Sequence, residues 1–149
     1  MVDGLVAAYG LTWAAAAIHF TAAVEHFGEH PSHAVLFTLL ACAQLLWGIA
    51  LYRSPSRRLL LIGVLMNVGV VAVWVVSRTS GIPIGPSPWR PEPVGLLDAV
   101  ASADEVAMAL LVGLRLRWAP GRASRWLEAV AVCLMLLSSV SITQLGHAH

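Results

Sequence analysis

The sequence predicts an all-α integral membrane bundle of about five transmembrane helices. Of the 149 residues, 58% are hydrophobic and 11% are charged, whereas a soluble domain usually carries about 25% charged residues. The hydrophobic residues form long blocks, and a block of about 18 residues can cross a hydrocarbon core about 30 Å thick. These blocks occupy most of the chain, so residues 1–149 are expected to form a single membrane domain.

Each predicted span is bounded by residues that interrupt a helix or carry charge. The first ends near Gly28 and Pro31, and Ser32 is expected to cap the second helix. A charged turn at residues 53–58 precedes the third span, which carries no charge. The fourth span contains three carboxylates, which makes it the weakest by hydropathy. The predicted spans are residues 5–27, 34–51, 59–76, 94–116 and 127–145.

A long connection at residues 77–93 follows the third span. It is rich in proline, which lacks an amide hydrogen and has a fixed φ angle, so an ordered extended loop is expected there instead of a helix. Its motif runs from Gly81-Ile82-Pro83-Ile84-Gly85-Pro86 through Trp89 and Pro91-Glu92-Pro93-Val94-Gly95 to Asp98 and Glu105. This motif resembles a group of small multi-span membrane proteins of GC-rich bacteria. The resemblance implies a membrane protein and does not indicate any particular activity.

The arginines predict the orientation of the bundle. With five spans, one side holds Arg53, Arg57, Arg58, Arg115, Arg117, Arg122 and Arg125, and the other holds only Arg78 and Arg90. Positive charge beside membrane spans stays in the cytoplasm. The N-terminus is therefore expected inside and the C-terminus outside, in a multi-pass protein of the bacterial cytoplasmic membrane.

On this topology the titratable side chains gather toward the outer side. All six histidines lie there: His19, His26, His30, His33, His147 and His149. Most of the carboxylates share that half, namely Glu25, Glu29, Glu92, Asp98, Asp104 and Glu105. The positive-inside rule concerns Lys and Arg and does not explain the placement of histidine. The segregation therefore suggests a functional site in the outer half.

Helix periodicity predicts which of these groups meet. His19 and His26 are seven residues apart and share a face of the first helix, while Asp98 and Glu105 share a face of the fourth. If these antiparallel helices are neighbours, His26 meets Asp98 near the surface and His19 meets Glu105 deeper in the bundle. Polar groups at such depth face the bundle interior and find partners there.

Imidazole and carboxylate together favour a transition metal, whereas calcium and magnesium prefer oxygen alone. The expected ligands are His19, His26, Asp98 and Glu105, followed by Glu25, His30 and Asp104, and the ion is zinc, copper, iron or manganese. His33 is interpreted as a helix-start residue. The leading hypothesis is a metal-binding membrane protein that acts in metal handling or redox chemistry.

Several alternatives stay open from the sequence. The protein could be a membrane-embedded metalloenzyme, either a hydrolase or an oxygenase, or a metal-free proton-relay transporter. The polar groups could also be structural contacts between helices, so the sequence does not decide whether the protein is an enzyme. The bilayer and a metal ion are the expected partners, a homodimer is an open alternative, and no basic run suggests nucleic acid.

Overall fold

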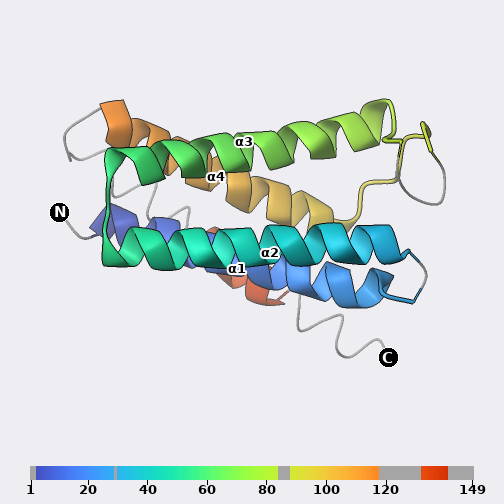
Figure 1. Cartoon of the computed structure of the whole chain (residues 1–149), viewed down its shortest axis with the longest axis horizontal. Coiled ribbons are helices and arrows are strands. Elements are labelled where there is room, and N and C mark those ends of the chain that lie inside the picture. The colour runs from blue at the N-terminus through green and yellow to red at the C-terminus, as the bar shows by residue number, and fades with distance from the viewer. Residues whose placement is uncertain (1–2, 29, 84–87, 118–131, 141–149) are drawn as a thin grey trace.

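The computed structural model describes residues 3–28, 30–83, 88–117 and 132–140, and all regular secondary structure in these ranges is α-helical (Figure 1). The all-α class is therefore confirmed for the described part of the chain. Residues 132–140 are helical and lie within the predicted fifth span, whose two ends fall outside the described ranges. The four long helices are α1 (Asp3–His26), α2 (Pro31–Arg53), α3 (Arg57–Thr79) and α4 (Leu96–Arg117).

The start of α2 differs from the prediction. His30 occupies the N-cap position without a side-chain capping bond, and Pro31 is the first helical residue. Proline suits this position because its missing amide hydrogen would have no partner there and its φ angle is already helical. Ser32 therefore lies inside the first turn, and its prediction as the cap was wrong. By contrast, Ser56 caps α3, because its Oγ accepts a hydrogen bond from Leu59 N at 3.3 Å.

Three helices are long and apolar enough to cross a membrane, over Val6–His26, Pro31–Arg53 and Arg57–Thr79. A helix of 23 residues, such as α2, is about 34 Å long, which exceeds the hydrocarbon thickness. Many of their large apolar side chains are exposed on the surface of the bundle, and Leu46 and Ile62 are 68% and 52% exposed. Such a surface suits lipid better than water. In α4, which is similar in length, three carboxylates lower the hydropathy.

Consecutive helices run in opposite directions. Of the helix pairs in contact, α2 and α3 share the least extensive one. Helix α1 packs against α2 and α4, and α3 packs against α4. Figure 1 shows α2 and α3 close together where the turn joins them and farther apart toward the opposite end. Near that turn Trp47 Nε1 donates to Leu59 O at 2.7 Å, and the Trp47 indole covers Gly63. Residues 132–140 lie beside α1, with Met135 against Gly10.

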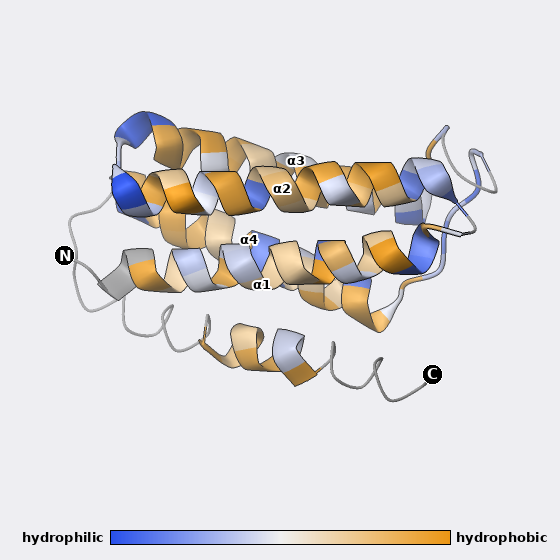
Figure 2. Ribbon diagram, turned by 60° about the horizontal axis from the view of Figure 1, so that its bottom comes forward, coloured by the Kyte–Doolittle hydropathy of each residue, from blue (hydrophilic) through white to orange (hydrophobic). Residues whose placement is uncertain are grey.

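The two ends of the bundle differ in chemistry. The arginine end contains the α2–α3 turn with Arg53, Arg57 and Arg58, and the hydrophobic core packs next to it, around Leu11, Trp47, Leu51, Met108 and Val112. The histidine end contains the α1–α2 turn and the proline loop. Figure 2 shows hydrophilic residues at both ends, with mostly hydrophobic turns of α2 and α3 between them. The dense core therefore lies in one half of the bundle and most of the titratable groups in the other.

The proline loop is held against the end of α3. Glu92 N donates to Ser77 O and Trp89 N donates to Ile82 O, both at 3.0 Å. Gly81 has a φ of 75°, and a Cβ there would lie 2.4 Å from Arg90 N, so only glycine fits this turn. Residues 77–79, which were predicted to belong to this connection, instead complete α3, and the described residues 80–83 and 88–93 contain no helix or strand. The expected ordered loop is thus seen at residues 81–83 and 88–93.

Candidate functional site

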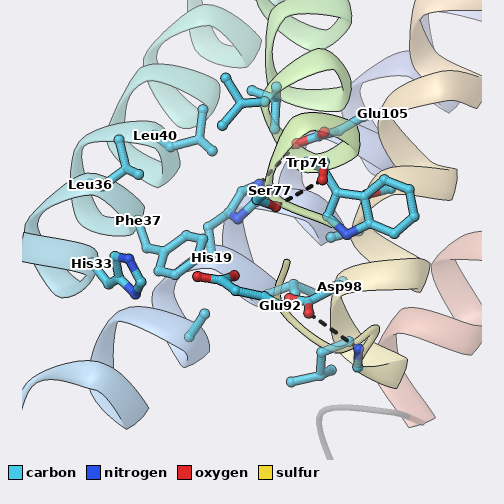
Figure 3. Close-up of a pocket in the computed structure, with 18 of the residues that line it drawn as sticks. His19, His33, Leu36, Phe37, Leu40, Trp74, Ser77, Glu92, Asp98 and Glu105 are labelled. Atoms are coloured by element: carbon cyan, nitrogen blue, oxygen red, sulfur yellow. Dashed lines mark hydrogen bonds and ion pairs between the residues drawn. The ribbon is translucent and has the colours of Figure 1, made fainter. Parts of the chain in front are cut away.

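His19 and Glu105 form a pair deep in the histidine half of the bundle, and we call them the deep pair. His19 Nε2 lies 2.9 Å from Glu105 Oε1, and the side chains are 7% and 1% exposed. One residue comes from α1 and the other from α4, which pack against each other in antiparallel directions. The predicted approach of these two side chains is therefore present in the structure, as Figure 3 shows.

A third helix completes the surroundings of the deep pair. Gln44 of α2 is fully buried, and its Nε2 donates to Glu105 Oε1 at 3.2 Å. Glu105 Oε2 and Gln44 Oε1 are buried without a hydrogen-bond partner among the described residues. Asn67 of α3, which the sequence places at a similar depth, is also buried but donates to Gly63 O in its own helix. Glu105 thus joins α1, α2 and α4.

Three histidines meet at the α1–α2 turn, and we call His26, His30 and His33 the outer cluster. The ring centroids are 5.5 Å apart for His26 and His33, 5.9 Å for His30 and His33, and 6.3 Å for His26 and His30. His33 is 8% exposed, and its Nε2 is buried without a partner in the described part of the protein. The sequence analysis treated His33 as a helix-start residue and did not anticipate its place in this cluster.

Phe37 separates the outer cluster from the deep pair. Its ring stacks on His19 with a centroid distance of 5.9 Å and on His26 with a distance of 5.6 Å. The interplanar angles are 12° and 28°. A hydrocarbon ring that contacts both imidazoles interrupts a direct hydrogen-bonded path between His26 and His19. The sequence analysis missed Phe37, although it lies one helical turn after His33 and so shares its face.

Asp98 has a different partner from the one the sequence suggested. Its carboxylate pairs with Arg78 at the end of α3, and the same guanidinium also pairs with Glu92 in the proline loop. His26 contacts His30, His33 and Phe37 instead. The expected approach of His26 to Asp98 is therefore absent among the described contacts. A nearby guanidinium satisfies a carboxylate better than a neutral imidazole does, because two fixed opposite charges attract.

Arg78 holds the loop to α3 and α4, and this arrangement leads to a prediction. Replacing Arg78 with methionine leaves Glu92 and Asp98 without their shared cation. Because both carboxylates are about one-third exposed, we expect a modest effect of about 1.4 kcal/mol, which is a tenfold change in the opening equilibrium. Hydrogen exchange of the Glu92 amide, which bonds to Ser77 O, measures this opening. The exposed Arg90 provides the control, and equal rates in R78M and R90M would contradict the prediction.

Asp104 faces away from the other predicted ligands, and no hydrogen bond or ion pair of Glu25 is found among the described residues. Asp104 is fully buried, and its Oδ2 lies 2.6 Å from Ser138 Oγ in the helical residues 132–140. It follows Glu105 directly in sequence, and neighbouring residues on a helix point about 100° apart, so it faces another helix. Glu25 is exposed beside His26 at the end of α1. His147 and His149 fall outside the described residues.

A cavity of about 1140 Å³ is lined by the deep pair, the outer cluster and the ion-paired Arg78, Glu92 and Asp98 (Figure 3). Its lining includes the imidazoles of His19, His26, His30 and His33. It also includes four carboxylates, from Glu25, Glu92, Asp98 and Glu105, against the single guanidinium of Arg78. With the buried Glu105 left out and neutral histidines, the three other carboxylates and Arg78 give the lining a formal charge of −2, which favours a cation at its surface.

As the side chains stand, no three His, Cys, Asp or Glu residues of the described ranges are close enough together to hold a metal ion. The seven predicted ligands divide into separate groups: the deep pair, two members of the outer cluster, Asp98 with Arg78, Asp104 with Ser138, and the exposed Glu25.

No protein-family model matches this sequence, and no curated protein or solved structure is significantly similar to it.

Proposed function

We propose that this chain is a multi-pass protein of the bacterial cytoplasmic membrane that binds a transition-metal ion through the outer cluster. The proposed orientation places the arginine end in the cytoplasm, because arginine beside membrane spans is retained there. The histidine end then faces outward, and the cluster receives its ion from outside the cell. The proposed role is metal handling or redox chemistry.

The approach of His26, His30 and His33 is the observation that carries this proposal. Imidazoles bound to one zinc ion have Zn–N distances of about 2.0–2.1 Å, which places their ring centroids roughly 5 Å apart in a tetrahedral site. The observed separations of 5.5 to 6.3 Å are only slightly larger. The three rings are therefore close to the spacing that one ion requires, and we expect side-chain rotation to direct their nitrogens at it.

Two further features support the same site. The Nε2 atom of His33 is buried without a partner, and a buried polar atom normally has one. The negative formal charge of the cavity lining attracts a cation. The other predicted ligands are engaged elsewhere, since Asp98 pairs with Arg78 and His19 with Glu105. Zinc, copper and iron are the ions of the predicted set that imidazole suits best.

A membrane-embedded metalloenzyme is the second candidate. Three histidines leave a fourth coordination position for water or substrate, as in catalytic zinc sites. The outer cluster also lines a cavity large enough for a substrate. A metal-free proton relay has less support, because Phe37 contacts both His19 and His26 and separates their rings.

Zinc titration of the purified protein in lipid nanodiscs tests the proposal. Every sample carries glutamine at positions 147 and 149, so that the measured ion is not held by the two terminal histidines. We expect one ion per chain and an affinity loss of at least about 100-fold in His33→Gln, because three imidazoles provide the binding energy. His19→Gln serves as the matched control and should bind zinc normally.

Cobalt gives an independent readout, because its visible spectrum reports the coordination of the ion. The tetrahedral spectrum expected for the parent protein should be absent in His26→Gln and His33→Gln. Zinc binding that is unchanged in His33→Gln, or that is lost only in His19→Gln, would refute the outer cluster as the site.

A further inference from the structure

The cavity reaches the surface of the bundle between α2 and α3. Its walls include Leu39 of α2 and Leu65 of α3, which line the cavity and are 64% and 71% exposed. In the membrane orientation proposed above, this surface faces lipid. Leu36, Leu40, Val70 and Val73 continue the apolar walls inward. A molecule dissolved in the bilayer can therefore enter from the side without passing through water. The volume of about 1140 Å³ matches that of sites that enclose small molecules.

The imidazole of His19 is a polar group at the inner wall of this largely apolar cavity. His19 lines the cavity, while its Nε2 lies against the carboxylate of Glu105 (Figure 3). When Nε2 donates its hydrogen to that carboxylate, the other ring nitrogen, Nδ1, is a hydrogen-bond acceptor. Nδ1 makes no hydrogen bond among the described residues. The bond to Glu105 and the stacking on Phe37 fix the plane of the ring.

His19 lies deep in the bundle, and this depth limits which chemical groups of a ligand can reach it. It lies seven residues from His26 along α1, which is about 10 Å farther into the bundle. A charged lipid headgroup loses its hydration at such depth, at a cost of several kcal/mol. A single hydroxyl is less costly to bury than a charged headgroup, and it regains a hydrogen bond by donating to His19 Nδ1.

We propose that the cavity binds a lipid-soluble molecule bearing a ring hydroxyl, a quinol or a phenol with a hydrocarbon tail, whose hydroxyl donates to His19 Nδ1. The apolar walls from α2 and α3 hold the tail, and the deep pair orients the acceptor. This site goes beyond the proposed metal function and uses no imidazole of the outer cluster, so either assignment can fail while the other stands.

The test measures equilibrium binding of tritiated decyl-benzoquinol, under argon, to the full chain in nanodiscs, with empty nanodiscs subtracted for partition into lipid. We expect saturable binding of one molecule per chain. Gly69 lines the cavity and has open space around its Cβ position, so Gly69→Leu should fill the cavity and weaken binding at least about tenfold. Gly113 of α4 also has open space around its Cβ position but lies outside the lining, so Gly113→Leu should bind normally.

His19→Gln tests the hydrogen bond, because the glutamine amide can still donate to Glu105 but places no nitrogen at the position of Nδ1. We expect binding about 3- to 10-fold weaker, as for the loss of one hydrogen bond. The ¹⁵N resonance of Nδ1, assigned by its absence in His19→Gln, should shift when decyl-benzoquinol is added. A merely structural role of His19 would not move this signal on ligand addition.

Three results would overturn the inference. Equal competition by decylbenzene, which lacks the hydroxyls, would mean that the cavity is an apolar crevice for acyl chains only. Binding that never saturates above the empty-nanodisc background would exclude the site. An unchanged affinity in His19→Gln, together with an unchanged Nδ1 resonance, would remove His19 from the recognition of the hydroxyl.

Discussion

Replacing Gly63 with alanine should lower the free energy of unfolding by about 2–4 kcal/mol, one of the two largest effects that we expect from a single substitution. A Cβ at this position would lie 2.1 Å from Cζ2 and 2.5 Å from Cε2 of the Trp47 indole. The indole cannot easily move away, because its Nε1 donates to Leu59 O at 2.7 Å. The substitution must therefore break that bond or separate α2 from α3.

Gly69→Ala is the matched control, because Gly69 lies in the same helix and a Cβ there meets no atom within 4 Å. We expect its stability to stay within about 0.5 kcal/mol of the parent protein, as for substitutions that create no clash. Thermal unfolding in mild detergent, followed by helical circular dichroism, compares the two variants. Equal melting temperatures for G63A and G69A would contradict the close approach of Trp47 to α3.

The second large effect is expected for Glu105→Ala. This change removes the acceptor of Gln44 Nε2 and the partner of His19 Nε2, and leaves both groups buried without it. Each buried polar group without a partner costs about 1–3 kcal/mol, although hydrogen bonds between membrane helices average only about 0.6 kcal/mol. We therefore expect a loss of about 2–4 kcal/mol once the vacated space is included.

Glu25→Ala provides the comparison for this carboxylate, because Glu25 is exposed at the end of α1. It should change stability by less than about 0.5 kcal/mol. Glu105→Gln should fall between the two alanine variants, since it keeps the shape of the side chain and one acceptor oxygen. Unfolding in mixed micelles with increasing SDS measures all three, and a loss for E105A no greater than for E25A would show that the deep pair is not buried as described.

The deep pair could be predicted from the sequence because it depends only on depth and helical phase. His19 and Glu105 lie at similar distances from the same end of two antiparallel helices. The first is recognised from hydropathy, and the fourth was still predicted as a span although three carboxylates weaken it. The side-chain contacts at the histidine end of the bundle could not be predicted in the same way. The partners of Asp98 depend on the path of the proline loop, which brings Glu92 back to Arg78, and periodicity contains no information about a loop.

The outer cluster was only partly predicted for a related reason. Hydropathy locates the apolar part of a helix, so the second span was expected to begin at residue 34, after His33. The helix instead begins at Pro31, and this earlier start places His33 in the first turn, on the same face as Phe37. Asp104 was predicted as a further ligand of the site that contains Glu105, yet adjacent residues point to different neighbours in a helix.

Among the described residues, Trp47 holds α2 to α3 near their turn through Leu59 and Gly63, and we expect this contact to act as a pivot for a tilt of α2 relative to α3. With a rise of 1.5 Å per residue, the Pro31 end of α2 lies about 24 Å from Trp47, so each degree of tilt moves that end by about 0.4 Å. Helix tilt responds to the thickness of the surrounding bilayer. We therefore expect the width of the proposed lateral entrance to depend on the thickness of the surrounding bilayer, because a thinner membrane that tilts α2 away from α3 would widen the passage to His19.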